Sequence, residues 1–292
     1  MNPYKAYNLY KKRAHKDTII IRTLCFFATG VALAILFGII AFIFAKGIPA
    51  INWKFLSTAT SYEEQNFGIL PNILNTVYIT VLSLLIVLPI GIGSAIYLSE
   101  YGKQGRLLSV IRYTIEILSG IPSIVYGLFG ALCFVTYLRM DYSLLAGACT
   151  LAVITLPIII RTTEESLKAV DVTYREAALS MGVNRLYIIR TILLPCAMPG
   201  IIAAVILSVG RMVGESAALL FTSGTAYEMP KNLLTMYDKS GATLTVQLYQ
   251  SFTEKPHWVP EDAPFAIAAV LMIVVLFLNI STYFVGKKLK RK

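Results

Sequence analysis

Two charged side chains in this sequence lie where charge is costly, and they are the first candidates for chemistry. Arg211 and Glu215 belong to the apolar run 196–221, and Arg211 lies about 15 residues into it, or ~22 Å along a helix at 1.5 Å per residue. An arginine at the centre of a membrane helix costs ~2.5–3.5 kcal/mol on insertion scales. In one continuous helix, Glu215 would share a face with Arg211 and pair with it. The two residues form either a buried ion pair that fixes packing or part of a path for an anion.

A second group of candidate residues lies in the charged segment 161–195. It reads Glu-Ala-Ala at 176–178, then three residues to Gly182, then nine residues to Ile-Leu-Leu-Pro at 192–195. Thr162 and Thr173 each begin an S/T-x-x-E pattern, in which hydroxyl and carboxylate cap the first turn of a helix, so we predict two short helices. We expect Gly182 to end the second one, because glycine enters the left-handed region without a steric penalty. Its weakly apolar face suits docking onto a partner, and a solvated hairpin is the alternative.

The elements that must position these residues are membrane helices. The chain is 57% apolar and only 14% charged, with mean hydropathy +0.69, whereas soluble domains carry about 25% charged residues. A bilayer crossing needs ~20 apolar residues, and six runs qualify. They are 19–45, 69–98, 115–137, 143–160, 196–221 and 264–285. The first run is far longer than the ~7–15-residue core of a signal peptide, so we expect it to stay attached as the first span.

The placement of basic residues predicts the direction of the crossings. Nineteen Lys and Arg residues fall in the N-terminal segment up to Arg22, in the C-terminal tail and in the connections after the second and fourth runs, against six in the other three connections. Basic residues collect on the cytoplasmic side of a membrane. We therefore expect a multi-pass membrane protein with both termini in the cytoplasm. Topology then explains the net charge of +10, and nucleic-acid binding is not expected.

Several kinds of chemistry find no support in the sequence. The four cysteines lie in apolar stretches without a CxxC or Cys/His cluster, so neither a disulfide framework nor a zinc site is indicated. No G-x-x-x-x-G-K-[ST] pattern occurs, so any ATP hydrolysis belongs to another chain. No pairing of nucleophile and base is visible either. We expect a protein that is not an enzyme and that binds neither a metal nor a cofactor.

The loop pattern resembles the EAA loop of bacterial ABC-type importer permeases, EAA-x3-G-x9-I-x-LP between two spans, and every position matches. The resemblance implies an all-α membrane protein with six transmembrane helices and the type I (MetI-like) importer permease architecture. It also implies a coupling helix that docks on a separate ATPase subunit. The residues implied in that contact are Glu176, Ala177, Ala178 and Gly182.

Two further segments resemble phosphate ABC transporter permeases, specifically the shorter of their two permease subunits. Residues 210–222 read GRMVGESAALLFT, similar to the fifth-helix signature, and residues 119–127 read SGIPSIVYG, similar to the third-span stretch. The family more often has GET-A-P-L-L where this chain has GES-A-A-L-L, although the serine keeps a hydroxyl. The resemblance implies that the substrate is phosphate and that its path includes Arg211, Glu215, Ser216, Ser119 and Ser123. For the two serines of the third span, packing around a kink is an equal alternative.

The same resemblance implies a complex in the lipid bilayer of the bacterial or archaeal cell (inner) membrane. This chain would join a second phosphate permease subunit, two copies of a cytoplasmic ATPase and an external phosphate-binding protein, although permease homodimers occur in related importers. We divide the chain into a cytoplasmic tail (1–18), a six-helix permease domain (19–286) and a basic cytoplasmic tail (287–292). The permease domain contains the coupling loop 161–195 and the external loop 223–263.

Two other functions fit parts of the sequence. Within the same class, the chain would carry another oxyanion, such as sulfate or molybdate. In a different class, it would be an ion-coupled secondary anion transporter that needs no ATPase. Secondary transporters are commonly built from inverted repeats, and we find none in this sequence.

Overall fold

The computed structural model describes residues 3–61, 65–102, 105–227, 238–254, 257 and 259–290. This part of the chain is helical and contains no strand, apart from one isolated bridge between Ser61 and Asn66. The elements, with π-helical segments labelled η, are α1 (Pro3–Ala50), α2 (Trp53–Ser57), α3 (Leu70–Ile96), η1 (Tyr97–Tyr101), α4 (Arg106–Ser119), α5 (Ser123–Gly130), η2 (Ala131–Tyr137), α6 (Leu144–Lys168), α7 (Val172–Ser180), α8 (Arg185–Ile188), η3 (Ile189–Leu193), α9 (Leu194–Val213), α10 (Ala217–Leu220), α11 (Leu244–Thr253) and α12 (Ala263–Lys290).

Within the described residues, five helical stretches are long and apolar enough to cross a membrane, or six if one bent pair is a single span. Each predicted apolar run corresponds to one of them. The third run, 115–137, is not one straight helix, because α4 and the helix that follows it meet at a bend of 100°. Pro122 lies at this bend and has no N–H to continue the α4 ladder. Hydropathy alone does not detect such a break.

The fifth apolar run, 196–221, is also displaced relative to the helix that contains it. The continuous helical stretch begins at Arg185 and ends at Val213, and a separate short helix, α10, follows. The preceding span α6 continues to Lys168, so the predicted loop 161–195 contains the end of one membrane helix and the start of the next. The connection between them is therefore shorter than the prediction, and α7 occupies most of it.

The core of the molecule lies among α3, α6 and α9, which pack against one another. Their buried side chains include Ile79, Leu151, Ala204 and Met212. On the outside, α12 packs on α9, and α1 packs on α12. A Cβ at Gly47 of α1 would clash with the backbone of Phe265 in α12, so glycine permits this close approach. The apolar side chains of α1 remain largely exposed, as expected of a helix surrounded by lipid or by another subunit.

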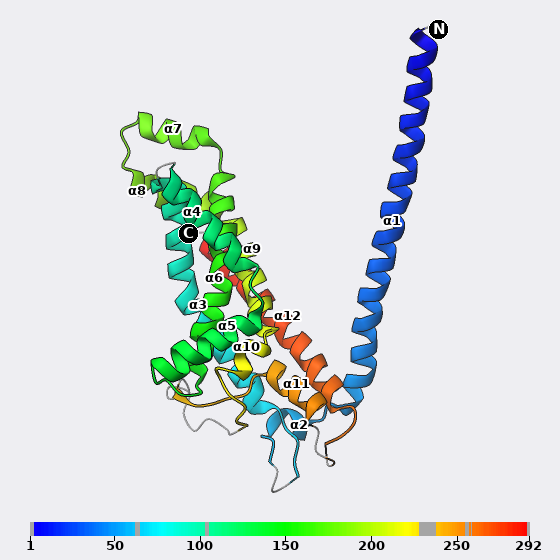
Figure 1. Ribbon diagram of the computed structural model, residues 1–292, viewed down its shortest axis with the longest axis vertical. Helices are drawn as coiled ribbons and strands as arrows, with labels where there is room; N and C mark the ends of the chain where they lie inside the picture. Colours follow the sequence, from blue (N-terminus) through cyan, green and yellow to red (C-terminus); the bar gives the residue numbers. More distant parts are fainter. Residues whose placement is uncertain are drawn as a thin grey trace.

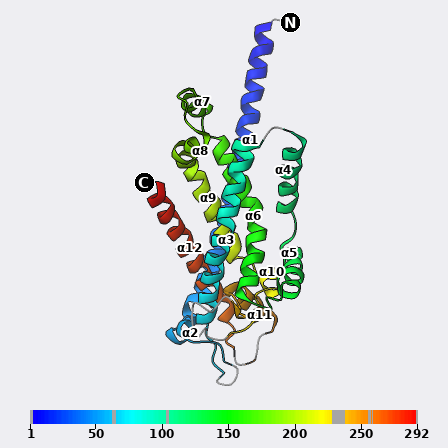
Figure 2. The same cartoon turned by 90° about the vertical axis from the view of Figure 1, so that its left-hand side faces the viewer.

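The two ends of the bundle carry different elements. Figures 1 and 2 show α7 and α8 at one end, toward which the start of α1 and the end of α12 both point. The short helices α2 and α11 lie at the opposite end. We call these the α7 end and the α11 end. This arrangement is the one that six crossings require, with both tails on the same side as the coupling loop.

We predict that the α7 end faces the cytoplasm. In a cysteine-free background, a cysteine added after Lys292 should not react with a membrane-impermeant thiol reagent in sealed, right-side-out cells. Glu254→Cys, at the exposed end of α11, is the matched control and should react. Labelling at the C-terminus with protection at Glu254→Cys would reverse the topology and place the loop outside the cell.

Candidate functional site

The start of α7 is capped by Asp171. One carboxylate oxygen of Asp171 accepts hydrogen bonds from the backbone N–H and the hydroxyl of Thr173, each at 2.9 Å. These bonds lower the pKa of the Asp171 carboxyl below its usual value. Its capping contribution is therefore complete above the ordinary carboxyl pKa, about 4, and is lost only as the pH falls through the lowered value.

The two predicted capping boxes are therefore wrong. Thr173 lies inside the first turn of α7 and donates to the cap instead of being the cap. At the other predicted start, Thr162, no helix begins, because α6 runs through it without interruption and buries Thr163. The S/T-x-x-E pattern does not reveal that a preceding helix continues, and tertiary packing of α6 decides the outcome.

The end of α7 confirms the prediction for Gly182. Gly182 has φ +75° and donates its N–H to Leu179 O at 2.9 Å, while Val183 N–H reaches back to Ala178 O at 3.2 Å. These two bonds form a Schellman motif, and the accompanying apolar contact is present because Val183 packs in the same cluster as Ala178. A Cβ at position 182 would meet no atom within 4 Å, so only the backbone conformation demands glycine here.

The remaining residues of the Glu-Ala-Ala motif divide between the inside and the outside of the molecule. Ala178 is 2% exposed and packs on a small apolar cluster that includes Leu167 and Ile188. Glu176 and Ala177 are exposed. The large apolar residues Tyr174 and Met181 lie on the same side of the helix as Ala177 and are 55% and 75% exposed. We call Tyr174, Ala177 and Met181 the open face of α7. Large exposed apolar patches are often sites of protein contact.

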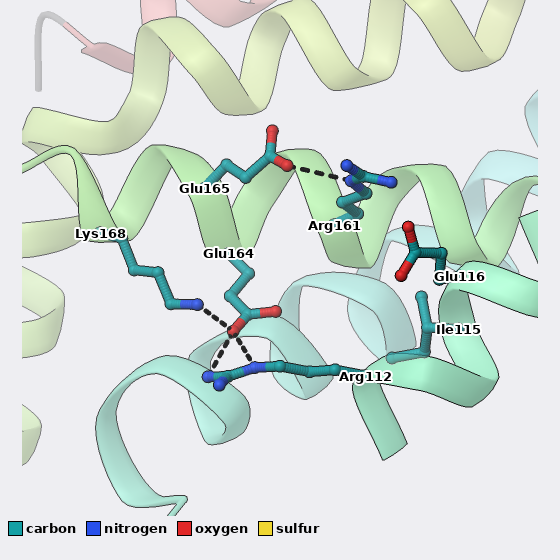
Figure 3. Close-up of a pocket in the computed structure, with 7 residues that line it drawn as sticks. All are labelled: Arg112, Ile115, Glu116, Arg161, Glu164, Glu165 and Lys168. Atoms are coloured by element: carbon teal, nitrogen blue, oxygen red, sulfur yellow. Dashed lines mark hydrogen bonds and ion pairs between the residues drawn. The ribbon is translucent and has the colours of Figure 1, made fainter. Parts of the chain in front are cut away.

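A cluster of charges lies near the α7 end of the bundle, where α4 meets the end of α6 (Figure 3). Glu164 is buried, and its Oε1 accepts from Arg112 at 2.7 Å and from Lys168 at 2.6 Å. Arg161 and Glu165 form a separate, exposed pair at 3.0 Å along one side of α6. These groups line a pocket of about 180 Å³. The i,i+4 pairs are readable from sequence, but the contact between Arg112 and Glu164 joins residues 52 positions apart, and no local pattern indicates it.

The predicted ion pair between Arg211 and Glu215 is not formed. Arg211 lies in the last turn of α9, which ends at Val213, so Glu215 lies beyond the helix and does not share its face. Glu215 Oε1 instead accepts the Ala218 N–H at 3.1 Å. Over the described chain, no carboxylate lies within ion-pair distance of Arg211. The C-terminal carbonyls of α9 favour a cation there by about 0.3–1 kcal/mol.

Two helices that follow the breaks in the spans pack near Arg211. A Cβ at Gly127 of α5 would lie 2.7 Å from Ala218 Cα of α10, so these helices touch through glycine. Tyr126, which sequence reasoning missed, is buried, lies within electrostatic range of Arg211, and donates its hydroxyl to Leu118 O at 2.7 Å. The only feature of the sequence that pointed to Tyr126 was its place in the segment 119–127, which resembles phosphate permeases.

The predicted serines differ in their surroundings. Ser123 lies one turn before Gly127, so it is on the side of α5 that faces α10. Ser216 precedes α10, and its hydroxyl does not cap that helix. Ser119 lies before the bend, is exposed, and donates to Glu116 O at 2.7 Å. The fold thus places Ser123 and Ser216 beside the helices near Arg211, while Ser119 belongs to α4.

The irregular segment between α9 and α10 is fixed by hydrogen bonds from the α11 end of the bundle. Thr245 of α11 donates its hydroxyl to Glu215 O at 2.9 Å. The segment that leads into α11 is fixed to α3, because Asn72 and Asn75 both donate to Ala242 O, at 3.1 and 3.0 Å. These contacts join segments up to 170 residues apart in sequence, and the sequence analysis did not anticipate them.

A bundle of apolar membrane helices with an exposed, glycine-terminated loop helix defines a permease subunit of an ABC-type importer. The chain belongs to the family of binding-protein-dependent transport system inner membrane components, whose sequence profile matches residues 87–292. The EAA loop and the segment around Arg211 both fall within the matched part.

Relatives of known description agree with this assignment. The chain is 34% identical over 272 residues to the "Probable ABC transporter permease protein YqgI" of Bacillus subtilis, covering 89% of this chain and 91% of that one. It is 35% identical over 263 residues to the phosphate transport system permease protein PstA of Pasteurella multocida, with the same coverage. With PstA of Haemophilus influenzae it shares 32% identity over 281 residues, covering 96% and 97%.

Solved structures support the fold. A bacterial ABC transporter involved in the import of the polysaccharide alginate matches with a TM-score of 0.57 at 14% identity, covering 88% of this chain and 95% of that one. The inward-facing methionine ABC transporter MetNI matches with a TM-score of 0.54 at 21% identity, covering 77% and 93%. The MetI-like permease architecture expected from the loop is therefore confirmed.

We predict that Gly182→Val loosens the end of α7. A β-branched residue at φ +75° costs about 1–2 kcal/mol, which corresponds to about 5–30-fold faster exchange of the Val183 amide. Hydrogen exchange followed by mass spectrometry on the purified protein measures this change. Gly182→Asn is the control and should exchange more slowly than the valine variant, because asparagine tolerates positive φ. Identical exchange in the valine variant and the unmodified protein would contradict the assigned helix end.

Proposed function

We propose that this chain is the permease subunit of an ATP-driven importer of inorganic phosphate. It would form the translocation path with a second permease, dock two copies of a cytoplasmic ATPase, and receive phosphate from an external binding protein. The PstA relatives support phosphate as the substrate, because they match nearly the whole chain at 32–35% identity. The coupling role of Glu176, Ala177, Ala178 and Gly182 and the cytoplasmic location of both termini belong to the same proposal.

The substrate assignment rests on one observation, the absence of a described ion-pair partner for Arg211. This guanidinium lies near the end of an apolar span, and over the described chain it has no carboxylate within ion-pair distance. A cation in a membrane segment is costly and is by default a functional group. Because neither Glu215 nor another described acid neutralises Arg211, its charge remains available to an anion that passes between α5, α9 and α10.

Glu215 lies in the break that follows Arg211, and we propose that it limits how tightly the anion is held and which anion passes. Near neutral pH, phosphate carries a P–OH group that can donate a hydrogen bond to a carboxylate. Sulfate carries no such group and would be repelled. The nearby hydroxyls of Ser123 and Ser216 would provide further hydrogen bonds along the path, and Ser119 would do so before the bend.

The coupling part of the proposal rests on the open face of α7. This face exposes Tyr174, Ala177 and Met181 outside the membrane helices, where a partner protein can cover them. Closure of the ATPase subunits would move α7 and switch the permease between inward-open and outward-open forms. The partner ATPase subunits would hydrolyse the ATP.

The proposed function is tested by reconstituting the complete complex in vesicles. Uptake of labelled phosphate should require ATP in the compartment that contains the ATPase, and the external binding protein should stimulate it strongly. ATP-dependent uptake of sulfate or molybdate without uptake of phosphate would assign another oxyanion. Phosphate uptake that follows an ion gradient without ATP would place the chain among secondary transporters.

We predict that Arg211→Gln reduces phosphate uptake at least tenfold, since the glutamine offers no charge to the anion. The measurement is ATP-dependent uptake at matched amounts of assembled complex. Arg161→Gln is the control: it also removes one arginine, but from an exposed pair that solvent screens, and its uptake should be unchanged. Normal uptake by Arg211→Gln would make Arg211 a structural residue.

For Glu215 we predict altered selectivity rather than loss of transport. Glu215→Gln keeps an oxygen that can accept the Ala218 N–H, so the start of α10 should survive while the negative charge is lost. The variant should retain part of its phosphate uptake and become more sensitive to competition by sulfate. The assay must bypass the external binding protein, whose own selectivity would mask the change. Loss of phosphate uptake without new sulfate sensitivity would contradict the selectivity role.

A further inference from the structure

We infer that Arg175 is a positioning residue that joins the coupling helix to the second membrane span through an ion pair with Glu100. The inference rests on the proposed docking of α7 on an ATPase. It adds a specific link by which motion of α7 reaches α3. Arg175 directly precedes the Glu-Ala-Ala motif, but its side chain points away from the open face, toward the membrane helices.

The contacts of Arg175 join three elements. Its Nη2 donates to Glu100 Oε1 of η1 at 2.8 Å and to Leu167 O near the end of α6, also at 2.8 Å. The side chains of Arg175 and Glu100 are only 23% and 13% exposed. Ser99 donates to the same carboxylate oxygen at 2.9 Å. A largely buried, hydrogen-bonded ion pair is far less screened than the surface pair between Arg161 and Glu165.

Apolar packing alone gives α7 little attachment to the bundle. Ala178 is its one buried residue, and a methyl group buries too little surface to fix the direction of a nine-residue helix. Figure 1 shows α7 lying beyond the ends of α3, α6 and α9, connected to α6 and α8 by loops. The ion pair of Arg175 therefore supplies most of the directional restraint between α7 and the spans.

A second arginine repeats this arrangement from the other side. Arg112 of α4 binds Glu164 of α6 and also donates to Leu98 O of η1 at 3.3 Å. Each arginine thus joins one carboxylate and one carbonyl, and each connects η1 with α6. Through this shared junction, α7 is linked to α4 and hence to the bent third span, whose second part, α5, packs near Arg211.

The junction of the two arginines with η1 lies in a π-helical segment of the chain. Glu100 belongs to the π-helical segment η1, which ends α3. Such segments often mark functional positions in helices. A displacement of Arg175 would move η1 directly through the ion pair with Glu100. The continuous backbone would transmit that displacement to α3. Removal of either partner would leave the other charge poorly compensated in a site that is mostly buried.

The test compares Arg175→Gln, Glu100→Gln and the double variant in the assembled complex. Three quantities are measured: the amount of ATPase that co-purifies with the permease, the stimulation of ATP hydrolysis by the loaded binding protein, and phosphate uptake per ATP hydrolysed. Both single variants should keep co-purification within twofold of the unmodified complex. Stimulation and uptake per ATP should fall at least tenfold. The double variant should be no worse than the single ones, because both remove the same interaction.

Controls separate this role from simple destabilisation and from docking. Arg161→Gln should leave all three quantities unchanged, because its pair lies within one helix and is exposed. Arg175→Lys, which keeps the charge, should recover part of the coupling. If Arg175→Gln does not accumulate, Glu100→Gln serves as the test variant, because it removes the same ion pair from the other side. Uptake per ATP within twofold of normal in the test variants would overturn the inference. Loss of co-purification would overturn it too, by making Arg175 a docking residue, and so would multiplicative losses in the double variant.

The two proposals fail in different ways. If the unmodified complex shows no phosphate uptake, the proposed substrate is wrong, and the role of Arg175 is still read from stimulation of ATP hydrolysis by the binding protein. If the unmodified complex transports phosphate and the Arg175 variants do so equally well, the positioning role alone is wrong.

Discussion

Two arginines hold the α7 end of the molecule together, and the geometry of the coupling loop depends on them. Arg175 of α7 and Arg112 of α4 both contact the junction of η1 and α6, and each pairs with a carboxylate that is mostly buried. Without the pair of Arg175, α7 would be held to the spans chiefly by one alanine and two loops. With it, the open face of α7 is presented outward on a defined support. The structure therefore links a surface suited to a partner protein with the membrane spans that would have to move.

The second constraint is that backbone polar groups inside a membrane must be satisfied within the protein. The described spans are helical for this reason, and they break at only two places of interest, 120–122 and 214–216. The helices that follow these breaks, α5 and α10, pack against each other. Irregular backbone at membrane depth is tolerated where it is buried in protein or lines a water-filled path. Arg211 lies beside these breaks, which agrees with the proposed anion path.

The sequence predicted those features that depend on composition or on one backbone conformation. The six apolar runs and the helix end at Gly182 are of this kind. Features that depend on where a helix stops were not predictable, because Arg211 and Glu215 share a face only if α9 continues beyond Val213. Contacts between distant segments were also not predictable from the sequence. Glu100 and Arg175 are 75 residues apart, and their pairing requires the folded arrangement of α3 and α7.

The central claim is that α7 and η1 move as one body. It is tested most directly by distances between spin labels in the complex with and without trapped ATP. One pair of labels joins Ser180 of α7 to Tyr101 of η1, and a second joins Ser180 to Lys287 of α12, which neither arginine contacts. The account predicts that ATP shifts the distance from Ser180 to Lys287 and leaves the distance from Ser180 to Tyr101 unchanged. A shift of the Ser180 to Tyr101 distance on ATP binding would contradict it.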